Sequence, residues 1–121
     1  MKLKTAFAVL AITTVLAGTV TATSAVAGSG ADCPSSNVCL YDYYNFDGLL
    51  GYRPSGMSRT SISSTNNDKM ASWINKMTTK AAWYPEYSGG PCYTIAENST
   101  DSALAIGWRD TASSWKTTGG C

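Results

Sequence analysis

The sequence predicts an all-β domain of two Greek-key motifs stapled by disulfides. Three observations support this fold class. Aromatic and β-branched residues stand in short runs between Gly, Pro, Asn and Ser, and helical periodicity is poor throughout. A repeat of about 40 residues runs through the chain. Four cysteines follow an N-terminal segment that is typical of a secretion signal.

Six of the short runs are expected to form strands. They cover residues 38–43, 49–53, 72–75, 81–84, 92–95 and 113–116. Turn-forming residues separate them, for example Asp47-Gly48 and Gly89-Gly90-Pro91. No linker or charge run divides the region, so we expect one domain.

The repeat appears when the sequence is shifted by 42 residues against itself. Six positions then match without a gap: Tyr41 with Trp83, Gly48 with Gly90, Ile62 with Leu104, Asp68 with Asp110, Ser72 with Ser114, and Trp73 with Trp115. Each copy is long enough for a four-stranded Greek key. Two such units, at about 33–76 and 77–121, are expected to pack as a sandwich with the paired Trp residues in its core.

The first copy contains a predicted folded hairpin. Tyr41 and Phe46 can stack across the turn, and Gly48 can adopt a positive φ there. Asp68 is expected to cap a second turn through nearby backbone amides.

Residues 1–27 have the layout of a signal peptide. Lys2 and Lys4 precede an apolar stretch, and Ala25-Val26-Ala27 fits the small-x-small rule for cleavage. We therefore expect a secreted, extracellular domain of residues 28–121, with no membrane contact after cleavage. A retained membrane anchor is the alternative, because residues 5–31 carry no charge.

An even number of cysteines after a signal peptide indicates disulfides. We favour Cys33–Cys39, which closes a short loop, and Cys92–Cys121, which ties the last residue to the body. Three pairings are possible in principle. A zinc site formed by the four thiols is the rival interpretation, but neither pair has the close C-x2-C spacing that zinc sites use.

Composition excludes several function classes. Nine basic and eight acidic residues leave no surplus for binding nucleic acid. The chain has no His, so a Cys or Ser nucleophile lacks its commonest base. Glu86 and Glu97 lie too far apart in sequence to suggest a catalytic carboxylate pair. We expect a monomeric binding protein and no enzyme.

Two families resemble this sequence. Tyr41, Phe46 and Gly48, together with the run from Asn67 to Ser72, resemble the two signatures of the βγ-crystallin Greek key. The opening Cys33-Pro34-x-x-x-Val38-Cys39-Leu40-Tyr41 resembles the Streptomyces-type metalloproteinase inhibitors, secreted actinobacterial proteins with the crystallin-like fold. The resemblance extends from Cys33 to Cys121. It implies a βγ-crystallin-like sandwich and an extracellular protease, most simply a metalloproteinase, as partner.

The second copy departs from the crystallin pattern. Tyr87 comes one place early after Trp83, and Arg109 replaces an expected Asn or Asp. In calcium-binding relatives these loops supply oxygen ligands. Asp68, Asp110 and Ser113 remain as candidate calcium ligands, fewer than the six to eight oxygens that Ca²⁺ prefers. The alternative is that both Asp residues only cap turns, and no other cofactor is expected.

As an inhibitor, the chain would present a rigid loop that enters a protease cleft like a substrate. The candidate loop is residues 89–95, in which Pro91 and a bridge at Cys92 would stiffen the backbone and Tyr93 would fill an apolar pocket. The resemblance also implies an inhibitory bond after a Cys, which here falls between Cys92 and Tyr93. The alternative is that 92–95 is only a strand, and residues 41–48 are the second candidate loop.

Two other functions fit the same fold: an extracellular calcium-binding or stress-related module, and a secreted toxin-like protein.

Overall fold

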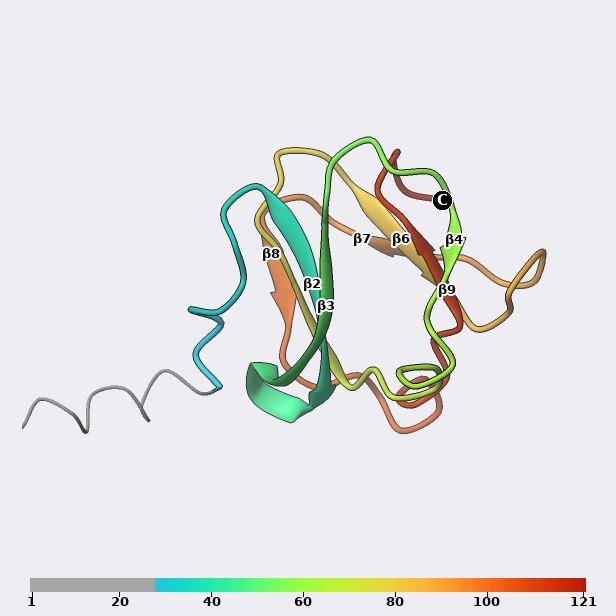
Figure 1. The fold of residues 1–121 in the computed structure, drawn as a ribbon, viewed down its shortest axis with the longest axis horizontal. Helices are drawn as coiled ribbons and strands as arrows, with labels where there is room; N and C mark the ends of the chain where they lie inside the picture. Colours follow the sequence, from blue (N-terminus) through green and yellow to red (C-terminus); the bar gives the residue numbers. More distant parts are fainter. Residues whose placement is uncertain (1–27) are drawn as a thin grey trace, which may run out of the picture.

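The computed structural model describes residues 28–121, in which every strand belongs to one of two antiparallel sheets (Figure 1). The elements are β2 (Asn37–Tyr43), η3 (Tyr44–Phe46), β3 (Asp47–Pro54), β4 (Thr60–Ser61), β5 (Ser72–Asn75), β6 (Ala81–Tyr84), β7 (Tyr93–Ile95), β8 (Ser99–Asp101) and β9 (Ser114–Lys116). The predicted all-β fold class is confirmed. The predicted signal peptide lies outside the described residues. Within them, no helix has the length and apolar character needed to cross a bilayer.

Each half of the chain contributes its third strand to the other half's sheet. Sheet one has the order β3-β2-β5-β8, and sheet two has the order β4-β9-β6-β7. Thus β8, which lies between β7 and β9 in the chain, pairs with β5, while β4 pairs with β9. The two sheets face each other in Figure 1 and enclose one core.

That core is built from alternating inward residues of both sheets, and Trp73 and Trp115 lie in it at 8% and 7% exposure. Their expected place is confirmed. A second cluster packs outside sheet one, where the Cys33–Cys39 disulfide meets buried Tyr41 and Ile74. The disulfides Cys33–Cys39 and Cys92–Cys121 are the predicted pairs.

The six predicted strands are present, with ends that differ by at most two residues. Two further strands, β4 and β8, were not predicted from the sequence. Both are only two or three residues long, consist of Ser, Thr and Asp, and bury no side chain fully. Such strands carry no hydrophobic alternation, because edge pairing with a distant partner defines them.

The ungapped register of the repeat was wrong at its first pair. Tyr41 pairs with Ser72 in sheet one, and Tyr84 pairs with Ser114 at the same place in sheet two. Tyr84, and not Trp83, is therefore the counterpart of Tyr41. The second hairpin is one residue shorter than the first, which shifts the offset from 43 to 42 along it.

The turns of the two halves hold each other by a reciprocal pair of backbone hydrogen bonds. The Asp68 N–H donates to the Ala112 carbonyl at 3.0 Å, and the Asp110 N–H donates to the Met70 carbonyl at 2.8 Å. Both Asp residues adopt the left-handed conformation, with φ of 60° and 61°. Asp tolerates this conformation better than most residues, which gives the repeated Asp a physical reason.

The first hairpin has the predicted geometry. Tyr41 and Phe46 meet edge to face with centroids 5.9 Å apart, and Gly48 has a φ of 72°. Ser72, fully buried beneath it, donates from Oγ to the Tyr43 carbonyl at 2.6 Å and accepts from the Phe46 N–H at 3.1 Å. One hydroxyl thus satisfies both ends of the turn.

Replacing Ser72 with Ala should lower the free energy of unfolding by about 1–3 kcal/mol, because a buried carbonyl and amide lose their partner. Urea unfolding measures this change. The exposed Ser64→Ala variant is the control and should stay within about 0.5 kcal/mol of the parent. Equal stability of all three proteins would contradict the assigned role of the Ser72 hydroxyl.

The buried Tyr41 hydroxyl makes stability sensitive to alkali. It donates to Asp32 Oδ1 at 2.8 Å. Burial raises the pKa of Tyr41 above its ordinary value, and the hydrogen bond to Asp32 and the Asp32 charge raise this pKa further. In the folded state the Tyr41 hydroxyl therefore retains a proton that it releases in the unfolded chain at about pH 10.

This contribution to stability is complete below about pH 10 and is lost as the pH rises above it. The free energy of unfolding should therefore fall more steeply between about pH 9 and about pH 11 in the parent than in Tyr41→Phe. Urea titrations at both pH values test this, and parallel slopes would refute it.

Candidate functional site

The segment that joins β6 to β7 projects from the body at the right of Figure 1. Residues 86–91 are exposed, and the Tyr87 side chain is 53% accessible. At the far end Cys92 is bonded to Cys121. The segment therefore combines an accessible surface with a covalent anchor.

Arg59 lies in the connection between β3 and β4 and holds this segment by hydrogen bonds. One terminal nitrogen donates to the Glu86 carbonyl at 3.0 Å and to the Gly89 carbonyl at 2.9 Å. Its Nε donates to Ser114 Oγ at 2.9 Å, and that hydroxyl donates to the Glu86 carbonyl at 2.6 Å. The guanidinium also lies 3.5 Å from the centre of the Tyr84 ring. A single side chain thus fixes both sides of the turn.

Comparison with the first hairpin explains this arrangement. There the Phe46 ring contacts the Tyr41 ring, and the backbone N–H of Phe46 donates to Ser72 Oγ. In the second hairpin the Arg59 side chain contacts Tyr84, the counterpart of Tyr41, and donates to Ser114, the counterpart of Ser72. Arg59 therefore takes over both contacts of the missing aromatic residue.

Of the predicted inhibitory residues, Pro91 is exposed, while Cys92 and Tyr93 are half-buried. The Tyr93 ring stacks on Trp83 with centroids 4.7 Å apart and lies 4.7 Å from Trp108 on a tilted plane. Tyr87 is therefore the more accessible aromatic ring of this segment. The strand that Tyr93 begins, β7, is one of the two edge strands of sheet two and pairs with β6 alone among the described strands.

The loop after β8 adds apolar surface beside Tyr93. Trp108 is 44% exposed, and Ile106, two residues earlier in the loop, is 81% exposed. Neither this loop nor Arg59 was predicted from the sequence to belong to a functional site. The exposed apolar pair Ile106-Gly107-Trp108 was the available signal, whereas nothing local marks Arg59, because its partners lie 25 or more residues away.

The second candidate loop, residues 41–48, is built differently. Tyr41 is buried and Phe46 half-buried, so of its aromatic rings only Tyr43 is strongly exposed, at 61%. Arg109 donates to the Tyr44 hydroxyl at 3.0 Å, which ties this hairpin to the loop after β8. The hairpin lacks a disulfide of its own in the described residues.

The candidate calcium ligands divide into two places. Ser113 Oγ donates to Asp68 Oδ1 at 3.3 Å. Asp110 lies instead in a hollow of about 200 Å³ with Asp42 and Arg109. Each place offers two of the named side-chain oxygen groups, and residues 28–121 contain no cluster of three or more Asp, Glu, Cys or His groups that could hold a metal. These donor sets do not fit a full Ca²⁺ shell.

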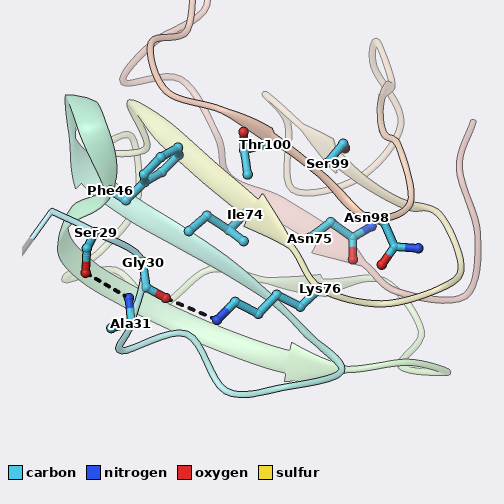
Figure 2. A pocket seen from close by; sticks show the side chains of 10 residues that line it. All are labelled: Ser29, Gly30, Ala31, Phe46, Ile74, Asn75, Lys76, Asn98, Ser99 and Thr100. Atoms are coloured by element: carbon cyan, nitrogen blue, oxygen red, sulfur yellow. Dashed lines mark hydrogen bonds between the residues drawn. The ribbon is translucent and has the colours of Figure 1, made fainter. Parts of the chain in front are cut away.

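A cavity of about 470 Å³ lies between the N-terminal segment of the described residues and the strands β5 and β8 (Figure 2). Ile74 and Phe46 form its apolar part. Lys76 is the ionisable side chain of the lining, and its Nζ donates to the carbonyls of Gly30 and Cys33 at 3.2 and 2.7 Å. The ammonium group thus fastens the N-terminal segment to the sheet.

The fold of this chain is similar to solved structures that include βγ-crystallin domains. One from Flavobacterium johnsoniae is 24% identical, with a TM-score of 0.53, over 65% of this chain and 90% of that one. One from Clostridium beijerinckii is 19% identical, with a TM-score of 0.51, over 65% and 93%. The N-terminal domain of Protein S is 14% identical, with a TM-score of 0.52, over 66% and 92%. At such identities these likenesses establish the fold, which is the predicted βγ-crystallin-like sandwich.

No curated protein matches the chain in sequence. The profile of peptidase inhibitor family I36 matches residues 26–93, more than half of the chain. The matched region contains the cysteine-rich opening that resembles the Streptomyces-type metalloproteinase inhibitors, and the segment held by Arg59. The chain therefore belongs to peptidase inhibitor family I36.

Proposed function

We propose that this chain is a secreted inhibitor of extracellular metalloproteinases, and that residues 86–93 form its contact loop. The observation that carries the proposal is the double anchoring of this loop, by the Arg59 side chain and by the Cys92–Cys121 disulfide. Family membership supports a protease as the partner. In this proposal the protein acts as a binding partner of the enzyme.

Rigidity is the physical basis of the inhibition. A flexible loop must be ordered when it enters a cleft, and each immobilised side chain costs about 0.5–1.5 kcal/mol of binding free energy. Arg59 and the disulfide order the loop in the free protein, so binding to the enzyme loses less conformational entropy. The same anchors keep the ends of a cleaved bond together, which disfavours release.

Within the loop, Tyr87 supplies the side chain that enters an apolar pocket of the enzyme. Aromatic anchors of this kind carry much of the energy in protein interfaces. Pro91, Cys92 and Tyr93 lead into the outer strand β7, whose unpaired edge can add to a strand of the protease cleft. The exposed Trp108, whose ring centroid lies 4.7 Å from that of Tyr93, lies beside the start of this strand.

Export follows from the predicted signal at residues 1–27 together with the two disulfides, because disulfides persist in oxidising compartments. A mature, monomeric domain that starts at Gly28 can then meet extracellular enzymes.

The purified protein should inhibit a thermolysin-like metalloproteinase at equimolar concentration and leave a subtilisin-like serine protease active. Tyr87→Ala should weaken inhibition at least about 30-fold, because a hot-spot aromatic contributes about 2 kcal/mol or more. The matched control is Tyr52→Ala, since Tyr52 is also 53% exposed but lies on β3 of the other sheet. Absence of metalloproteinase inhibition, or equal loss in both variants, would refute the proposal.

Arg59→Lys keeps the charge but removes the planar guanidinium, which donates from Nε to Ser114 Oγ and from one terminal nitrogen to the two carbonyls at the same time. We expect inhibition to weaken by about tenfold, and amides in residues 86–90 to exchange faster with solvent. Exchange mass spectrometry and inhibition assays measure the two effects. Arg109→Lys is the control, because Arg109 contacts the other hairpin. Unchanged exchange in Arg59→Lys would mean that the guanidinium does not hold the loop.

A further inference from the structure

The two halves of the core are filled differently at three equivalent positions. Leu40 pairs with Gly51 as Trp83 pairs with Tyr93. The turn bonds from the Asn66 N–H to the Ser63 carbonyl and from the Trp108 N–H to the Ala105 carbonyl make a third equivalent pair. The second half thus carries Trp83, Tyr93 and Trp108 where the first half carries Leu40, Gly51 and Asn66.

In the second half these three side chains form a stack, in which the Tyr93 ring lies between the two indoles. In the first half the place of that ring is a hollow of about 140 Å³, whose apolar lining is Leu40, Leu50, Ile62 and Trp115. A Cβ placed on Gly51 would meet no atom within 4 Å. The hollow therefore exists because glycine stands where its counterpart is tyrosine.

We propose that this hollow is a binding site for a single phenolic ring. Its size is close to that of the apolar protein cavity of about 150 Å³ that binds benzene. Leu40, Ile62 and Trp115 are 2%, 8% and 7% exposed, so they form a fixed apolar wall. Ser61 and Ser63 also line the hollow and supply hydroxyls for the phenol oxygen. The Tyr93 side chain in the other half is the internal precedent for the ligand.

The Asn66 side chain helps to keep the site open. Its amide nitrogen donates to the Leu50 carbonyl at 2.9 Å, which directs this group to the backbone and leaves the hollow unfilled. The counterpart, Trp108, instead covers the Tyr93 ring. The site is separate from the loop held by Arg59, so it stands whether or not the protein inhibits a protease.

The test is a titration of the ¹⁵N-labelled protein with p-cresol, which is the tyrosine side chain as a free molecule. A ligand of so few atoms should bind in the millimolar range. We expect saturable shifts at the Gly51 amide and the Trp115 indole N–H, with none at Tyr93 and Trp108. No saturable shift, or shifts confined to the Tyr93 side, would overturn the proposal.

N-acetyl-tyrosinamide identifies the source of the ring. Binding of both compounds assigns the site to a tyrosine side chain of a polypeptide, whereas binding of p-cresol alone assigns it to free phenols. Failure of both compounds to bind refutes the site.

Gly51→Tyr should fill the hollow from within and abolish the p-cresol shifts. Gly51→Ala is the matched control: it removes the freedom of glycine without filling the space, so it should still bind. Gly51→Tyr should also raise the melting temperature by roughly 4–8 °C and exceed the rise in Gly51→Ala. If Gly51→Tyr still binds p-cresol at the same residues, the proposal is wrong. If this variant does not fold, the shift map of the parent protein decides.

Discussion

The structure depends on the exchange of one strand between its halves. Because β8 completes the sheet of the first half and β4 that of the second, neither half can form its sheet alone. The reciprocal bonds between Asp68 and Ala112 and between Asp110 and Met70 join the same two halves at their turns. The two halves therefore share one core. A small domain has little apolar surface to bury, and a shared core buries more of it than two separate cores would.

Duplication left two hairpins that have since diverged. The first hairpin is held by its own residues, because the Phe46 ring packs against the Tyr41 ring within the same turn. In the second hairpin the turn is held by Arg59, a residue from the other half. The side chains of the turn itself are therefore not needed to hold its conformation. Tyr87 can face solvent because Arg59 and Ser114 have taken the structural contacts. Rigid scaffolds commonly carry functional loops in this way.

The core shows the same divergence. In the second half the side chains of Trp83, Tyr93 and Trp108 pack against one another and fill the space around Tyr93. This packing also places the partly exposed Trp108 beside the loop. Gly51 and Asn66 leave the corresponding place of the first half open. A repeat that keeps its backbone can therefore acquire two different surfaces, one in each half.

The sequence alone determined the fold class, six strands, both disulfides and the burial of Trp73 and Trp115, because alternation, spacing and composition are local signals. For the candidate site, the sequence suggested Pro91, Cys92 and Tyr93 as inhibitory residues, which stays a prediction, and it indicated neither the exposure of Tyr87 nor the stacking of Tyr93. Only the tertiary structure decided the strands β4 and β8, the counterpart of Tyr41 and the position of Arg59. Each of these is defined by a partner distant in the chain, and one residue lost from a hairpin changes the register without altering the pattern of apolar residues.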